Sequence, residues 1–123
     1  MTMTISGTQR LARWLVILTP AAIPAPVLRV GVRCLVDTLG IMLAGATTRS
    51  ATSARQVVLD IAAPGDVAVV GSPRRLTASA AAFANGVAAH ALDFDDNCNA
   101  GFVHGSAVII PAALAAQSLK ECG

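Results

Sequence analysis

Five side chains that can exchange protons lie within fifteen residues of one another. His90, Asp93, Asp95, Asp96 and His104 belong to the stretch HALDFDDNCNAGFVHGSA in a chain that is otherwise poor in charge. Adjacent carboxylates compete for protons, so one of a pair can keep its proton near neutral pH. Imidazole side chains in general change charge in the same range. The stretch therefore predicts a site for general acid/base catalysis.

Apolar residues that repeat at helical spacing surround this stretch. They predict five helices, at about residues 8–18, 26–45, 50–62, 76–91 and 106–119. Thr8 is expected to cap the first helix, and Pro26 suits the first turn of the second. The segment DVAVVG predicts one short strand or an extended linker. We therefore expect an all-α fold of about five helices with at most one short strand.

The second helix has the strongest periodic pattern in the chain. Its apolar residues recur every three to four positions and form one stripe, made of Leu28, Val32, Leu35, Leu39 and Leu43. Three small residues leave another flank of this helix bare, which suits the close approach of a neighbouring helix: Gly40, Ala44 and Gly45.

The acidic residues fall in the connection between the fourth and fifth helices, at about residues 93–104. Long connections in compact domains are often functional. His90 and Asp93 are three apart, so they can share a face of the fourth helix's last turn. The fifth helix opens near Gly105 and Ser106, where free backbone amides can hold an anion. This arrangement predicts a small anionic substrate beside the acid/base groups.

Structural roles compete with each of these interpretations. Taken alone, Asp95 and Asp96 are better explained as solvated residues or as turn formers that bond their own backbone. His90 on an Ala-rich helix suits a packed, hydrogen-bonded role, and nothing near Cys98 indicates an activated thiolate. Asn85, followed by glycine, can mark a helix break or a tight contact.

A divalent cation is a further alternative for the histidines and aspartates of this stretch. Their spacing matches neither an HExxH pair nor a calcium-binding loop with a glutamate at its twelfth position. We therefore predict no metal ion at the site.

The composition limits the kinds of assembly and partner that fit the chain. Hydrophobic residues make up 54% and charged residues 13% of the sequence. That leaves too little polar surface for an isolated globule, so we expect a fragment or a subunit that buries surface in an assembly. The nine Arg and Lys residues are scattered and the only aromatic residues are one Trp and three Phe, which argues against nucleic-acid binding.

Neither a membrane span nor a secretory signal fits the sequence well. The best apolar helix, residues 76–92, has 17 residues and several polar ones, whereas a span needs about 20 apolar residues. The apolar start of the chain is interrupted by prolines and lacks a clean cleavage site. An odd number of cysteines, Cys34, Cys98 and Cys122, favours a reducing compartment. We expect a cytoplasmic protein.

Several stretches of the chain resemble one known family. FANGVAAHALDFDDN, followed by HGSAVIIPAALA, resembles the signature of the MmgE/PrpD family, which includes 2-methylcitrate dehydratase, cis-aconitate decarboxylase and iminodisuccinate epimerase. LVDTLGIMLAGA resembles the family's second-helix motif, and LARWLVIL with IPAPVL resembles its opening. The likeness covers nearly the whole chain.

The resemblance implies roles for individual residues. Asp93 and His104 match positions counted among the family's active-site residues. Asp93 would transfer a proton or contact a substrate carboxylate, and His104 would act as an acid/base or anion contact. His90, Gly105 and Ser106 join Asn97 as expected substrate-binding residues. No cofactor is implied.

Two departures from the family pattern lie in the same loop. Asn97 stands where the family often has threonine, and HGS at residues 104–106 replaces the usual HPS. Both changes leave the identity of the polycarboxylate open, together with the choice among dehydration, decarboxylation and epimerisation.

The resemblance also implies a larger protein. Family enzymes are several times longer and add the rest of the helical domain and an α+β lid, with the active site between them, and most are homodimers. We therefore expect residues 1–123 to be a partial helical domain of a lyase or epimerase acting on a small polycarboxylate, inactive alone. The alternative is a non-catalytic helical module that pairs with itself or another chain.

Overall fold

The computed structural model describes residues 5–119, and this part of the chain is mainly helical. The elements are α1 (Gly7–Ile17), the 3-10 helix η1 (Pro20–Ala22), α2 (Ala25–Gly45), α3 (Arg49–Ile61), β1 (Pro64–Ala68), β2 (Arg75–Leu76), α4 (Ala78–His90) and α5 (Gly105–Ala116). The expected all-α fold with about five helices is confirmed. The chain forms two compact units, Met1–Val32 and Arg33–Gly123. No helix within residues 5–119 is both long and apolar enough to cross a membrane.

The first unit contains α1, and its cap differs from the expected one. Ser6, not Thr8, precedes the helix: its hydroxyl accepts a hydrogen bond from the Gln9 amide (3.2 Å), and the Gln9 side chain accepts one from the Ser6 amide (3.0 Å). This reciprocal pair satisfies two amides that a helix start leaves open. α2 then begins at Ala25, so Pro26 lies in its first turn as predicted.

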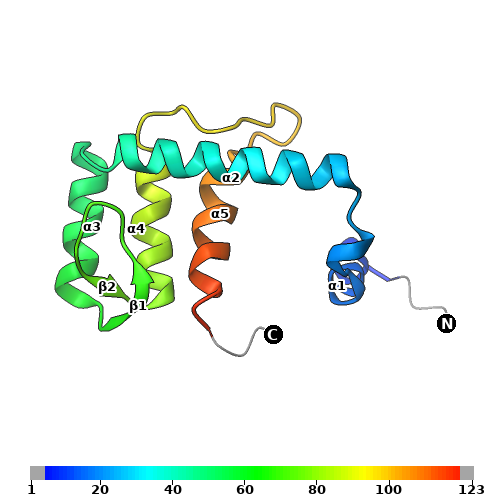
Figure 1. Cartoon of the computed structure of the whole chain (residues 1–123), viewed down its shortest axis with the longest axis horizontal. Coiled ribbons are helices and arrows are strands. Elements are labelled where there is room, and N and C mark those ends of the chain that lie inside the picture. Colours follow the sequence, from blue (N-terminus) through cyan, green and yellow to red (C-terminus); the bar gives the residue numbers. More distant parts are fainter. Residues whose placement is uncertain (1–4, 120–123) are drawn as a thin grey trace. The chain divides into compact units, whose positions relative to one another are not determined.

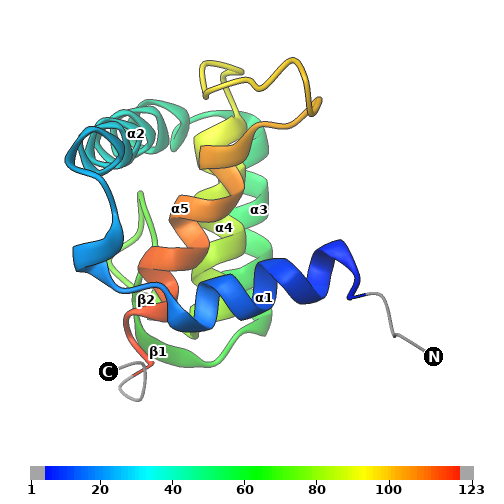
Figure 2. The same cartoon turned by 90° about the vertical axis from the view of Figure 1, so that its right-hand side faces the viewer.

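The second unit is built around three neighbouring helices. α4 packs against both α3 and α5, and the second half of α2 crosses one end of these helices (Figure 1). The connection from α4 to α5, residues 91–104, lies at the same end, whereas β1 and β2 lie at the opposite end (Figures 1 and 2). The loop with the acidic residues is therefore fixed at both of its ends by packed helices.

Residues 64–76 contain two strands where the sequence predicted at most one. β1 pairs with β2 antiparallel, with Val67 opposite Leu76 and Ala68 opposite Arg75. Leu76, predicted to start the fourth helix, belongs to β2 instead, and α4 begins at Ala78. A two-residue strand is too short to show a sequence period, so only its partner strand defines it.

Asn85 fastens this hairpin to α4 from a largely buried position. Its Oδ1 accepts a hydrogen bond from the Val70 amide (2.9 Å), and its Nδ2 donates to the Ala68 carbonyl (3.0 Å). The side chain thus pairs one backbone group of the last residue of β1 and one just beyond it, as buried polar groups require. The asparagine of the NG pair is therefore a structural residue.

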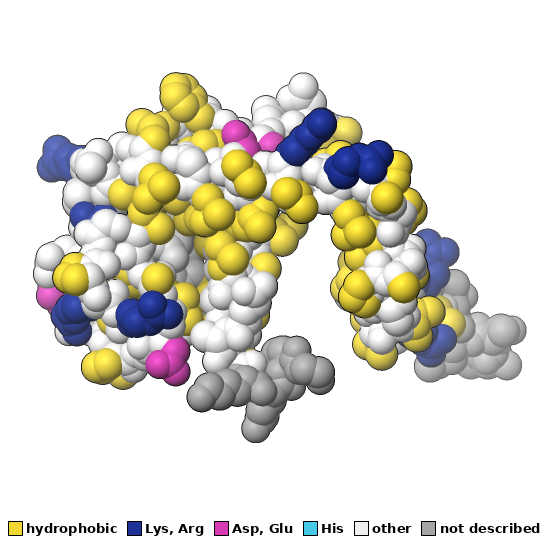
Figure 3. All heavy atoms as spheres, viewed as in Figure 1, with side chains coloured by type: hydrophobic (Ala, Val, Ile, Leu, Met, Phe, Trp, Pro, Cys, Tyr) yellow, Lys and Arg dark blue, Asp and Glu magenta, His cyan; other side chains and the backbone are white. Residues whose placement is uncertain are grey.

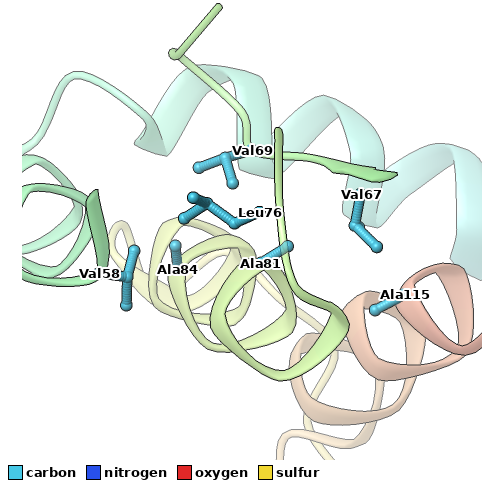
Figure 4. Packing of buried hydrophobic residues seen from close by; sticks show 7 residues of the cluster. All are labelled: Val58, Val67, Val69, Leu76, Ala81, Ala84 and Ala115. Carbon is cyan, nitrogen blue, oxygen red and sulfur yellow. The ribbon is translucent and has the colours of Figure 1, made fainter. Parts of the chain in front are cut away.

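The main hydrophobic core lies between the hairpin and α3, α4 and α5. Leu76 is fully buried at its centre, and the surrounding side chains are small or β-branched, as Figure 4 shows: Val58, Val67, Val69, Ala81, Ala84 and Ala115. A second cluster joins Met42 of α2 to Ala89 of α4 and Ala107 of α5. This second cluster holds the ends of α4 and α5 together beside the 91–104 loop.

Close backbone approach explains one of the two glycines predicted on the flank of α2. A methyl group at Gly45 would overlap the backbone carbonyl of Ala88, so only glycine lets the end of α2 reach α4. At Gly40 an added methyl group would meet nothing within 4 Å. Of these two glycines, only Gly45, at the C-terminal end of α2, is needed for close packing against α4.

Substituting the two glycines should give opposite effects on stability. Gly45→Ala should lower the free energy of unfolding by about 1–3 kcal/mol because the methyl group forces α2 away from α4. Gly40→Ala, the matched control, should be neutral or stabilising by up to about 1 kcal/mol because alanine favours the helix. Urea unfolding followed by circular dichroism measures both, and equal effects would contradict the close packing at Gly45.

Candidate active site

A buried carboxylate, that of Asp95, joins two imidazoles at the junction of α4 and α5. Its side chain is 1% exposed. An ionised carboxylate only accepts hydrogen bonds, so His90 donates from Nδ1, which lies 3.0 Å from Asp95 Oδ1 and 3.1 Å from Oδ2. His104 Nδ1 lies 3.1 Å from Oδ2 as well. Both histidines therefore turn the same ring nitrogen toward Asp95.

The two imidazoles come from the facing ends of two helices. His90 is the last residue of α4, and His104 immediately precedes α5. Their ring centroids are 4.8 Å apart, and the ring planes meet at 69°. The packing of α4 on α5 thus fixes the distance between the rings, and the loop between the helices supplies the carboxylate.

The two contacts with Asp95 differ in geometry. The His90 contact is a hydrogen bond to both carboxylate oxygens. His104 Nδ1 is within ion-pair distance, but the contact lacks hydrogen-bond alignment, and this buried nitrogen has no other partner among the described residues. Catalytic hydrogen bonds are often poorly aligned before substrate binds. The His104 ring is therefore the less constrained of the two.

Asp93 turns the chain out of α4. Its amide donates to the His90 carbonyl (3.0 Å), and its φ of 54° lies in the left-handed region, which aspartate tolerates better than most residues. The side chain is exposed. One ligating atom from each of Asp93, His90, Asp95 and His104 lies within 4.8 Å of the others. The structure therefore brings the two predicted catalytic residues, Asp93 and His104, to one place.

Asp95 is the residue that the sequence interpretation underestimated. The sequence favours a solvated or turn-forming role for Asp95, but its side chain is buried and contacts both histidines. The available signal was the pair of histidines that flank the loop, since an imidazole is often oriented by a hydrogen bond from Nδ1 to a carboxylate. Sequence spacing did not show which of the three aspartates would turn inward.

Asp96 caps the start of α5 from ten residues upstream. Its Oδ1 accepts a hydrogen bond from the Ser106 amide (2.9 Å), and Gly105 stands beside the same carboxylate. The sequence predicted that free amides here would seat an anionic substrate. Instead, the carboxylate of Asp96 accepts the hydrogen bond of the Ser106 amide, because a negative charge is favourable at a helix N-terminus.

The far end of the loop is folded back by a short backbone pairing. The Cys98 amide donates to the Val103 carbonyl (2.9 Å), and Phe102 takes a φ of 50° with its side chain 93% exposed. Asn97, predicted to bind substrate, is exposed and does not line the hollow beside the histidines. Cys34 and Cys98 are free thiols, and Cys122 lies outside the described residues.

An open hollow of about 750 Å³ lies beside the two histidines, against α4 and α5. His90 and His104 line it together with mostly apolar residues, among them Phe83, Val87 and Val108. No Lys, Arg, Asp or Glu lines it among the described residues. Gly86 belongs to its floor, where a methyl group would lie 3.3 Å from the Ala107 carbonyl. A ligand in this hollow would meet the histidines as its main polar partners.

The same four side chains could also ligate a divalent cation, because two imidazoles and two carboxylates are suitable donors. The observed contacts have a simpler account. The His90 Nδ1–H hydrogen-bonds the buried carboxylate of Asp95, and His104 Nδ1 lies 3.1 Å from the same carboxylate, so the cluster is explained without any cation. We therefore favour the acid/base interpretation of the cluster and predict that it binds no metal ion.

Two comparisons with known proteins give results. The family model described as the MmgE/PrpD N-terminal domain matches residues 9–122. The chain is 32% identical over 116 residues to the cis-aconitate decarboxylase-like protein oryM of Aspergillus oryzae (strain ATCC 42149 / RIB 40). That match covers 94% of this chain but 24% of oryM, so the chain spans about a quarter of the length of this relative. No solved structure matches the chain.

Removing the remote cap should destabilise the helix that carries His104. Asp96→Ala should cost about 0.5–2 kcal/mol of unfolding free energy, because the Ser106 amide loses its acceptor. Asp96→Asn is the matched control, since its amide oxygen still accepts the hydrogen bond, and it should cost less. Thermal unfolding compares the two variants, and an Ala variant as stable as the Asn variant would show that the cap contributes nothing.

Proposed function

Because the chain belongs to the MmgE/PrpD family, we propose that it forms part of a lyase or epimerase that acts on a small polycarboxylate. The chemistry proposed is acid/base proton transfer at a carbon next to a carboxylate group. The observation that carries the proposal is the pair of imidazoles held on buried Asp95 beside an open hollow. Such groups are suited to removing and returning protons.

Each residue of the site has a proposed part. His104 is the principal acid/base, since its ring is less tightly held than that of His90 and both line the hollow. Exposed Asp93 stands within 4.8 Å of the same cluster, where it transfers a proton or contacts a polar group of the substrate. For Ser106 only the hydroxyl is left for a substrate contact, since its amide donates to Asp96, and the residue does not line the hollow.

Substrate recognition needs groups beyond those described. A polycarboxylate carries several negative charges, and the hollow has no Lys or Arg among its described lining residues. Buried anions require charged or hydrogen-bonding partners. We therefore propose that cationic groups from further protein complete the site and that residues 1–123 alone do not turn over substrate. The fraction of oryM that the chain spans is consistent with this.

The cellular compartment and the binding partners of the protein are also proposals. The free thiols of Cys34 and Cys98 suit a reducing compartment, so we propose a cytoplasmic protein. We propose no cofactor and no nucleic-acid or membrane partner, and we propose self-association, as a homodimer or a larger assembly.

Substitutions at the two proposed catalytic residues should reduce turnover without unfolding the protein. In the catalytically active protein that contains this chain, His104→Ala and Asp93→Asn should each lower kcat by about 10²–10⁴, the range that general acid/base catalysis contributes. Rates are measured with 2-methylcitrate, cis-aconitate and iminodisuccinate, and circular dichroism checks folding.

Asn99→Ala is the control for these two variants, because Asn99 is exposed and lines no part of the hollow. Its kcat should equal that of the unsubstituted protein. Unchanged kcat in both His104→Ala and Asp93→Asn would remove these residues from the proposed roles. Turnover by residues 1–123 alone would contradict the need for further protein.

A non-catalytic assembly module is the second candidate function, and exposed apolar side chains favour it. On α2 the predicted apolar stripe is largely uncovered, with Leu39 39% and Leu43 68% exposed. Val108 and Ile109 of α5 are 72% and 66% exposed. Figure 3 shows hydrophobic side chains gathered over α2. Apolar surface of this kind is typical of protein interfaces.

The exposed stripe should cause self-association of the isolated chain. We expect light scattering at micromolar concentration to give a mass above 12.4 kDa, because water contact with exposed apolar surface is unfavourable. Leu39→Gln with Leu43→Gln should shift the mass toward the monomer, whereas Gln56→Ala, an exposed site on α3, should not. A sharp monomer peak for the unsubstituted chain would argue against this alternative.

A further inference from the structure

The carboxylate of Asp95 is buried against two imidazoles. Its side chain is 1% exposed, so its carboxylate is almost fully removed from water. Among the described residues it forms no ion pair with Lys or Arg, and its recorded partners are the two imidazoles. A buried carboxylate is costly unless hydrogen-bond donors surround it. His90 and His104 are therefore the groups that make its burial tolerable.

This requirement fixes the state of the histidine rings. A carboxylate accepts hydrogen bonds and donates none, so a ring that faces it is stabilised when that ring nitrogen carries the proton. Both rings face Asp95 with Nδ1. In a neutral imidazole, a proton on Nδ1 leaves Nε2 with a free lone pair. The carboxylate thus favours the Nδ1–H tautomer of His90 through a hydrogen bond. It favours the same tautomer of His104 through a 3.1 Å contact with Nδ1 that lacks hydrogen-bond alignment.

We propose that Asp95 is a positioning residue that holds His90 and His104 together in the Nδ1–H form, so that both Nε2 atoms are available to accept a proton. Both rings line the hollow, and neither Nε2 has a hydrogen-bond partner among the described residues. The use of these nitrogens in catalysis rests on the function proposed above. The tautomer assignment itself does not, because it follows from the contacts of Asp95.

A substitution at the neighbouring residue Asp96 can distinguish this positioning role from a general contribution to loop structure. Asp96 accepts a backbone amide at the start of α5 and contacts neither ring nitrogen. It is one residue away from Asp95 and carries the same functional group. A change at Asp96 therefore perturbs the loop and the helix start but leaves the partner of both rings in place.

Nitrogen-15 NMR of the histidine rings in the 123-residue chain tests the proposal directly. The chemical shift of each ring nitrogen distinguishes a protonated from an unprotonated atom, and it is read at a pH where the rings are neutral. We expect Nδ1 protonated and Nε2 unprotonated in both His90 and His104. A ring with its proton on Nε2 would overturn the shared positioning role, whatever the activity of the protein.

Asp95→Asn shows whether the carboxylate is the cause. The asparagine amide replaces one accepting oxygen with a donating NH2 group. His90 Nδ1 contacts both carboxylate oxygens of Asp95 and His104 Nδ1 contacts Oδ2, so in either orientation this NH2 group faces the Nδ1 of at least one ring and disfavours a proton there. We expect at least one ring to lose part of its Nδ1–H population. Asp96→Asn, the matched control, should leave both rings as in the unsubstituted chain. Two unchanged rings in a folded Asp95→Asn chain would overturn the proposal.

Folding and activity are read separately. The dispersion of backbone amide signals reports folding, and if Asp95→Asn unfolds, the rings of the unsubstituted chain still decide the proposal. In the active protein, Asp95→Asn should lower kcat by about 10²-fold or more with little change in KM, because a wrong tautomer impairs the chemical step. Tautomers as expected, together with full activity of His104→Ala, would leave this inference standing and reject the proposed function.

Discussion

The candidate site depends on one buried carboxylate, that of Asp95, because removing such a group from water is unfavourable unless hydrogen-bond donors surround it. Asp95 is buried where α4 ends and α5 begins, and two neighbouring imidazoles contact it. Because a buried carboxylate needs donors, it constrains the positions of both rings. Because His90 ends α4 and His104 immediately precedes α5, it also ties the two helices to each other at the loop. The same contact therefore contributes to folding and orders the groups proposed for catalysis.

Small side chains make this geometry possible. α4 is rich in alanine, and Gly86 brings its backbone close to the Ala107 carbonyl of α5. Gly45 does the same where α2 meets α4. Close helix packing leaves little freedom in the separation of the two imidazoles, which is what a site for proton transfer needs. The bulk of the core lies elsewhere, around Leu76 and the hairpin, so the site lies at the edge of a packed body.

Much of the helical organisation was predictable because it is local. The helix from Ala25 to Gly45 and the stops near Ala62 and His90 follow from apolar spacing, proline and glycine. The second strand was missed because Arg75 and Leu76 show no periodicity of their own. On α2 the apolar stripe containing Leu39 and Leu43 was identified, but the buried face instead contains Thr38 and Met42. Periodicity marks a face, and only packing decides which face is covered.

The sequence by itself determined the helical class, the family resemblance and the gathering of acid/base groups between two helices, because each depends on residue types and short-range spacing. The tertiary structure decided which role each of three aspartates close in sequence takes. Asp93 turns the chain, Asp96 caps α5, and Asp95 alone is buried against both histidines. That choice depends on how the loop closes over the packed ends of α4 and α5. The loop brings together residues that are distant in sequence. Spacing along the chain therefore does not show which aspartate side chain will point inward.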